Sequence, residues 1–202
     1  STVFTDWIDN DLLKTNAVTK IIFAAGVTDI GDQSFKNKSS LQTIQFPASA
    51  KRIGSRAFYG CNGLEKIAIP EGVANIAGNA FEGCAKLVAV DVVGGNPTYA
   101  SQDGVLFNKT KTDLIKCPEG KKQSYAIPDG VTGIGNHAFY RCQRLETVTI
   151  PDGVTSIGTD AFSECTDLTA ITIPGSVNTI GHKAFSACTK LTGITIPRGV
   201  AT

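Results

Sequence analysis

Residues 145–167 read LETVTIPDGVTSIGTDAFSECTD, and residues 168–190 follow directly with LTAITIPGSVNTIGHKAFSACTK. With Val and Ile exchanged freely, both fit the 23-residue pattern L-x-x-I-x-I-P-x-x-V-x-x-I-G-x-x-A-F-x-x-C-x-x. Further copies begin at Leu41 and Leu64, weaker ones at Val18 and Lys122, and a half copy at Leu191. A fixed period of this size indicates one small structural unit stacked on copies of itself. The sequence therefore predicts a repeat solenoid.

Each position of the pattern has a structural reason. The two apolar residues of I-x-I point to one side of a short strand, and Pro ends that strand because it has no N–H to donate. The V-x-x-I segment predicts a second extended edge, and the spacing of A-F-x-x-C suits a short helical turn. We expect an α/β-type solenoid, a right-handed superhelix with one parallel sheet, short second strands and short helical turns. The strands of that sheet are expected at residues 43–46, 66–69, 147–150, 170–173 and 193–196.

The repeats resemble the leucine-rich repeats of the BspA-like class, which occurs in surface proteins of host-associated bacteria and in some parasitic protists. The resemblance covers Val18 to Thr202 and implies a leucine-rich-repeat fold and an extracellular or cell-surface location. Residues 103–109 and 114–118 resemble the hairpin-bearing insert of that family. The commoner leucine-rich repeat carries an Asn after the strand, whereas Pro stands nearby here. The usual internal Asn ladder is therefore absent, and the turns must satisfy their backbone groups in another way.

The regions outside the regular repeats complete the expected organisation. Residues 87–121 form an irregular insert, with 35 residues where 23 were expected. Residues 1–17 are apolar enough to form an N-terminal cap, with Trp7 against the first coil or, alternatively, as a ligand anchor. Residues 18–202 are expected to form one structural domain. Because the chain starts at Ser1 and stops within a repeat, we expect a cleaved precursor or a fragment, with further repeats or domains beyond Thr202.

Composition and motifs argue against several classes of function. Lys and Arg number 19 and Asp and Glu 18, a net charge of +1 that gives no support to nucleic-acid binding. No apolar run is long enough to cross a bilayer, so direct membrane insertion is not expected. Residues 133–138 fit G-x-G-x-x-A, but they belong to the repeat and lack the context of a nucleotide site. His137 and His182 are expected at the surface, without a metal or a catalytic triad. We therefore expect no cofactor and no enzyme activity.

The six cysteines allow two interpretations. Five of them occupy one column of the repeat, and three disulfides would be the usual expectation for a secreted chain. Equivalent residues in stacked coils have parallel Cβ vectors, so their sulfur atoms do not face each other. This favours buried, reduced thiols that pack as small apolar groups. The five are Cys61, Cys84, Cys142, Cys165 and Cys188.

The candidate partner-binding residues lie in two places. The strand residues outside the apolar pair should form a flat, nearly uncharged face, represented by Thr147, Thr149, Thr172 and Thr195. The alternative is a β-surface merely kept soluble by Thr. The insert is the second place, with Tyr99, Phe107 and Lys109 on a projecting hairpin or, alternatively, in a joint between two half-solenoids.

The leading hypothesis is a non-catalytic extracellular protein-interaction or adhesion module of a cell-surface protein. It would bind a host matrix protein, a glycan or another cell through the strand face or the insert. The alternatives are a structural spacer for another domain and, least favoured, an enzyme.

Overall fold

Residues 18–200 are described in a computed structural model of the chain, and the cap expected at residues 1–17, with Trp7, lies outside them. The chain divides into two compact units, residues 1–104 (unit 1) and residues 105–202 (unit 2). The boundary falls inside the expected insert. Each unit has its own stacked coils and its own interior.

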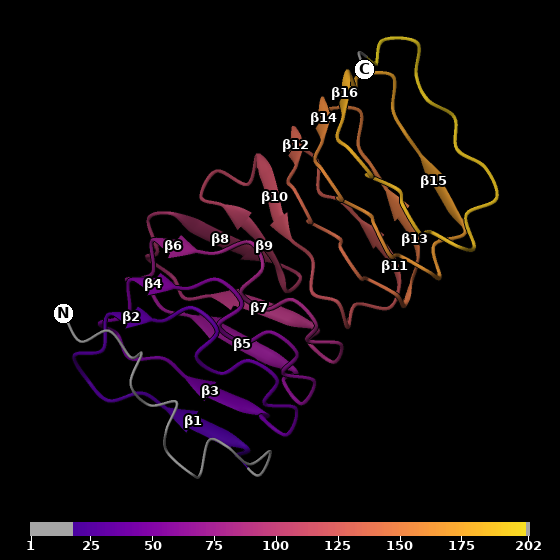
Figure 1. The fold of residues 1–202 in the computed structure, drawn as a ribbon. Helices are drawn as coiled ribbons and strands as arrows, with labels where there is room; N and C mark the ends of the chain where they lie inside the picture. The colour runs from indigo at the N-terminus through magenta and orange to yellow at the C-terminus, as the bar shows by residue number, and fades with distance from the viewer. Residues whose placement is uncertain (1–17, 201–202) are drawn as a thin grey trace. The chain divides into compact units, whose positions relative to one another are not determined.

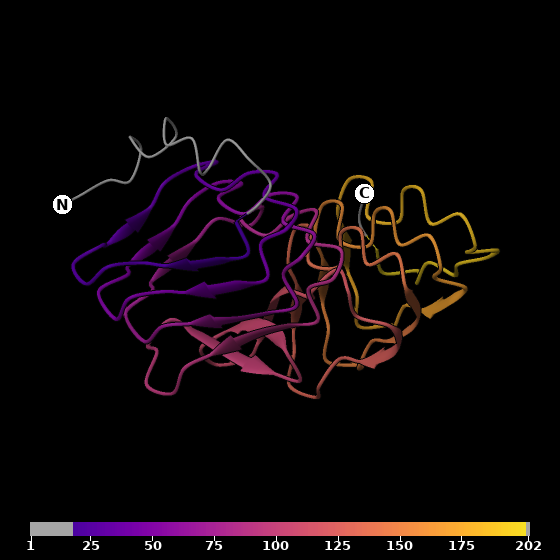
Figure 2. The same ribbon diagram turned by 90° about the horizontal axis from the view of Figure 1, so that it is seen from below.

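Unit 1 is a stack of coils, each with a first strand and, in three coils, a shorter second strand (Figures 1 and 2). Paired strands run parallel with a 23-residue offset, as Lys20 with Thr43 and Arg52 with Asn75. The first strands are β1 (Lys20–Ile22), β3 (Thr43–Gln45), β5 (Lys66–Ile69) and β7 (Ala89–Val92); the second strands are β2 (Asp29–Ile30), β4 (Arg52–Ile53) and β6 (Asn75–Ile76); β8 (Tyr99–Gln102) lies in the insert. The predicted solenoid of stacked parallel coils is confirmed in this unit.

Unit 2 opens with a hairpin and continues as a second stack. The hairpin strands β9 (Val105–Asn108) and β10 (Asp113–Lys116) are antiparallel. The first strands that follow are β11 (Gln123–Ala126), β13 (Leu145–Thr149) and β15 (Ala170–Thr172), and the second strands are β12 (Gly133–Ile134), β14 (Ser156–Ile157) and β16 (Thr179–Ile180). The first strands pair in parallel in this order. The second strands also pair in parallel in their order, and β12 pairs in parallel with β10.

The prediction of one parallel sheet on the strand face is wrong. The described first strands form separate ladders, β1 with β3, β5 with β7, and β11 with β13 and β15. The interruption between β3 and β5 coincides with a change in the inward column from Phe46 to Ile69. Residues 193–196 are not a strand, since no described coil covers them and Ile196 is 48% exposed.

The helical turns predicted at A-F-x-x-C are also wrong, because residues 18–200 contain no helix. Two residues in most of these segments adopt left-handed backbone angles, as Arg56 (φ 52°) and Gly60 (φ 70°) do. The backbone N–H of Phe58 donates to the Ala80 oxygen of the next coil (2.9 Å), while that of Tyr59 donates within its own turn. In an α-helix every N–H would bond within its own coil. The alternation instead ties each coil to the next.

The recurring Phe residues form the centre of each interior. Phe58 and Phe162 are fully buried. The rings stack between coils, with centroid distances of 5.4 Å for Phe35–Phe58, 5.8 Å for Phe58–Phe81, 4.7 Å for Phe139–Phe162 and 5.3 Å for Phe162–Phe185. There are thus two Phe stacks, one in each unit, and Phe185 at the end of the second is only partly buried.

The cysteines supply the turn contacts that the missing Asn ladder would otherwise make. All six are free and buried, so the burial predicted for the five cysteines of the repeat column is confirmed. The Cys61 Sγ donates to the Phe35 carbonyl of the preceding coil at 3.1 Å, and the Cys165 Sγ does the same to Phe139 at 3.1 Å. Burial raises the pKa of Cys61 to about 12. The Cys61 thiol is therefore a protonated hydrogen-bond donor at neutral pH.

Candidate functional site

The strand face consists of the exposed side chains of the first strands in each unit. Along β5 the exposed Lys66 and Ala68 alternate with the buried Ile67 and Ile69. The positions between the two inward residues are exposed in every described coil: Ile22, Gln45, Ala68, Asp91, Ala126, Thr149, Thr172 and Thr195. The period-2 alternation follows from the pleat of a strand, which places the apolar pair inside and leaves the residue between them in solvent.

In unit 2 the strand face carries the predicted threonines. Thr147 pairs with Ala170 and Thr149 with Thr172, so the three threonines lie together on neighbouring strands β13 and β15. All three are exposed. A shallow depression of about 310 Å³ runs between these strands. Thr195 is exposed too, but it lies in a segment that is not a strand.

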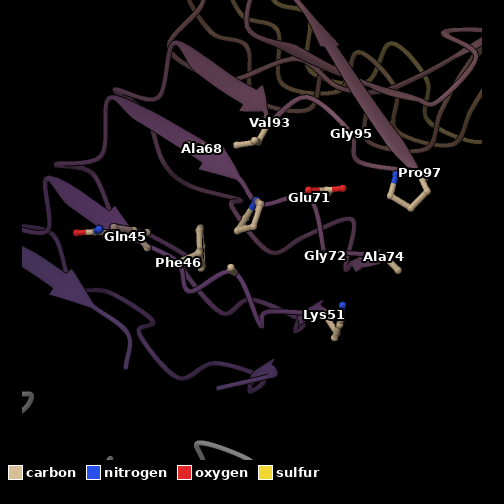
Figure 3. A pocket seen from close by; sticks show the side chains of 13 residues that line it. Gln45, Phe46, Lys51, Ala68, Glu71, Gly72, Ala74, Val93, Gly95 and Pro97 are labelled. Atoms are coloured by element: carbon tan, nitrogen blue, oxygen red, sulfur yellow. The ribbon is translucent and has the colours of Figure 1, made fainter. Parts of the chain in front are cut away.

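In unit 1 the strand ends border a groove that sequence analysis missed. It lies at the carboxyl ends of β3 and β5 and beside the chain that follows β7, with a volume of about 1030 Å³ (Figure 3). Its walls include large apolar side chains, Phe46, Pro70, Val93 and Pro97, and its remaining lining is mostly Ala and Gly.

Two opposite charges border this groove. Lys51 and Glu71 are both exposed and come from successive coils (Figure 3). Each lies against a glycine of the following coil: a Cβ on Gly72 would come within 3.0 Å of the Lys51 Nζ, and one on Gly95 within 2.8 Å of a Glu71 carboxylate oxygen. Glycine at these two places therefore leaves room for the charged side chains.

The predicted insert residues separate in the structure. Phe107 is fully buried in the interior of unit 2, so its expected place on a projecting hairpin is wrong. An aromatic ring that follows two apolar residues on an inward-facing strand is more favourable in the core than in solvent. Tyr99 is half-buried, and its hydroxyl accepts a hydrogen bond from the Ile76 N–H at 3.1 Å. Only Lys109, in the hairpin turn, is exposed.

The titratable groups do not converge on a metal or catalytic centre in the part of the chain that is described. No group of three His, Cys, Asp or Glu side chains within residues 18–200 is arranged to hold a metal ion. His137 is half-exposed, as predicted, and its Nε2 lies 3.7 Å from an Asp160 carboxylate oxygen. His182 is exposed as well. The described residues also include no helix that is long and apolar enough to cross a membrane.

Two solved structures are similar to this chain over about nine-tenths of its length. The pneumococcal vaccine antigen PcpA is 27% identical with a TM-score of 0.76, over 89% of this chain and 51% of that one. A leucine-rich cell surface protein from Faecalibacterium prausnitzii A2-165 is 31% identical with a TM-score of 0.71, over 90% of this chain and 54% of that one. This chain thus spans about half the length of either relative.

A leucine-rich repeat protein of Treponema pallidum (T. pallidum) shares the fold at 22% identity, with a TM-score of 0.56 over 86% of this chain and 78% of that one. No curated protein sequence matches. The sequence profile described as the BspA type leucine rich repeat region, of six copies, matches residues 7–123 and 116–202. The chain therefore belongs to the BspA-type leucine-rich repeat family.

Proposed function

We propose that this chain is a non-catalytic protein-interaction module of a cell-surface protein, and that its strand face receives the partner. The observation that carries the proposal is the alternation along the first strands. The apolar residues of the repeat lie in the interior, while the residues between them form a surface that is exposed in both units and nearly uncharged in unit 2. Stacked repeats use such extended surfaces for binding.

The family and the named relatives support the extracellular and adhesive part of the proposal. One relative is a vaccine antigen of pneumococcus and another is a cell surface protein. A protein at the cell surface would meet partners of three kinds: host matrix proteins, surface glycans and proteins of other cells.

Within the two places predicted from sequence, the strand face is the stronger candidate. In the insert, Phe107 is buried and the Tyr99 hydroxyl accepts an internal hydrogen bond. Of the three candidate residues there, Lys109 is the exposed one. By contrast Thr147, Thr149 and Thr172 present three neighbouring hydroxyl-bearing side chains on paired strands.

The test is a binding screen against immobilised matrix proteins and glycans, followed by two variants. The double variant Thr149→Arg/Thr172→Arg adds bulk and charge to the strand face without changing the interior, because both side chains are exposed. It should weaken the affinity for a strand-face partner at least tenfold. Lys109→Glu changes the hairpin and should leave binding unchanged. Binding of the wild type should depend only mildly on salt, since few charges take part. Loss of binding in the Lys109 variant alone would place the site on the insert and contradict the proposal.

A further inference from the structure

The groove of unit 1, which the strand-face residues Gln45 and Ala68 help to line, differs in chemistry from the strand face of unit 2. The strand face is flat and polar in unit 2, whereas the groove is hollow and has apolar walls. Val93 is 50% exposed and is among the large apolar side chains most open to solvent in residues 18–200. Hollows lined mainly by apolar side chains, with a few polar groups beside them, are typical of binding sites.

The charges at its edge favour a zwitterionic occupant. Lys51 and Glu71 lie on successive coils, and neither forms an ion pair with another residue in the range 18–200. Two opposite charges beside one apolar hollow are complementary to a ligand that carries an acidic group, an apolar group and a basic group in a row. A polypeptide offers this combination within a few residues.

Other features of the lining also suit a polypeptide. No described residue accepts a hydrogen bond from the backbone N–H groups of Gly72 and Gly95, and both residues line the groove. A glycan is a poorer match, because Gln45 is the one uncharged polar side chain of the lining and the Phe46 ring already stacks on Phe23 at 5.8 Å.

We infer that this groove binds an extended segment of a partner protein, in which an apolar side chain is flanked by one acidic and one basic residue. The apolar side chain packs against Phe46, Pro70 and Val93. The acidic residue faces Lys51 and the basic residue faces Glu71. The inference rests on the proposed function as a protein-interaction module and gives it a second, chemically defined site.

The probe is a fluorescein-labelled dodecapeptide on a Gly/Ser background, with a central Leu between Glu and Lys, made in both charge orders. Binding to the full chain is measured by fluorescence anisotropy. The peptide with one of the two charge orders should bind more tightly than the peptide with the other. A peptide with Ser in place of Leu should bind at least about tenfold more weakly, because it loses the buried apolar side chain. Equal binding of the Leu and Ser peptides would overturn the inference.

A charge swap gives the sharpest test. Lys51→Glu and Glu71→Lys should each weaken the preferred peptide by up to about fivefold, the range of an exposed ion pair. The double variant should prefer the opposite charge order. The matched control is Asp152→Lys, which makes the same kind of change at the same repeat position in unit 2 and should have no effect. An unchanged order preference in the double variant would overturn the inference.

Occupation of the groove itself is tested by filling it. Ala48 is exposed and lines the groove, so Ala48→Leu should block the peptide without disturbing the interior; circular dichroism checks the fold. Asp152→Leu is the control at the equivalent position.

Competition by chitohexaose or heparin oligosaccharide, but by no peptide, would assign the groove to a glycan and overturn the inference. Self-association in sedimentation that Ala48→Leu abolishes would assign it to a second copy, with the same consequence. The strand-face variant Thr149→Arg/Thr172→Arg should bind the peptide with unchanged affinity. A failure of the groove inference can therefore be distinguished from a failure of the proposed function.

Discussion

Replacing Phe162 by Ala should destabilise the chain more than the same change at the end of its stack. Phe162 is fully buried, and its ring stacks on Phe139 at 4.7 Å and on Phe185 at 5.3 Å. Removal of a buried Phe costs about 3–5 kcal/mol through lost burial and the cavity left behind. Of this, each aromatic pair accounts for about 0.5–1.5 kcal/mol.

Phe185 supplies the internal comparison. It is partly buried and stacks on a single described ring, that of Phe162. Phe185→Ala should therefore cost roughly half as much, about 1.5–2.5 kcal/mol. The measurement is urea unfolding of both variants, with the slope of the unfolding free energy on urea concentration compared to confirm that the denatured states are similar. A loss below about 1 kcal/mol for Phe162→Ala, or an equal loss for the two variants, would refute the stacked interior.

Two further predictions concern the thiols and the coil spacing. Burial raises the pKa of Cys61 from 9.0 to about 12, so its stabilisation is complete below pH 9.0 and is lost as the pH rises towards 12. Above pH 9.0 the free energy of unfolding in urea should fall as the pH rises. In Cys61→Ala it should fall by about 1.4 kcal/mol less per pH unit than in the wild type. Equal dependence of the unfolding free energy on pH in the two proteins would contradict this. Gly181→Ala should cost roughly 1–3 kcal/mol in the same assay, because its Cβ would collide with the Thr159 backbone of the preceding coil. Gly175→Ala has no atom within 4 Å of its Cβ and should be neutral; similar losses in the two would argue against close coil contact.

The stacking of the coils could be predicted from the sequence because it depends on residues that recur. Ile67 and Phe58 each have counterparts one period away, and the only way to bury all of them is to stack the copies. The turn conformation could not be predicted in the same way. The A-F-x-x-C spacing fits one turn of helix, but residues such as Arg56 and His137 adopt left-handed angles that non-glycine residues rarely take. Bonds to the next coil compensate for that conformation, and they are absent from any single copy.

The candidate site was predictable only where it follows the repeat. The exposure of Thr149 and Thr172 follows directly from strand alternation. The groove of unit 1 depends on what differs between copies, such as Ala48 beside Phe46, and on how three coils meet. The burial of Phe107 depends on the inward side of a hairpin that has no second copy in the chain to reveal its pattern.

The most direct test of the stacked interior is a thiol count with Ellman's reagent (DTNB), before and after unfolding without reductant. The cysteine column lies inside, and its thiols are free, buried and donate to carbonyls of the preceding coil. The native protein should therefore show almost no reactive thiol, with Cys188 at the end of the column reacting first, and all six should react on unfolding. Rapid reaction of several thiols in the native protein, or fewer than six after unfolding, would contradict the account.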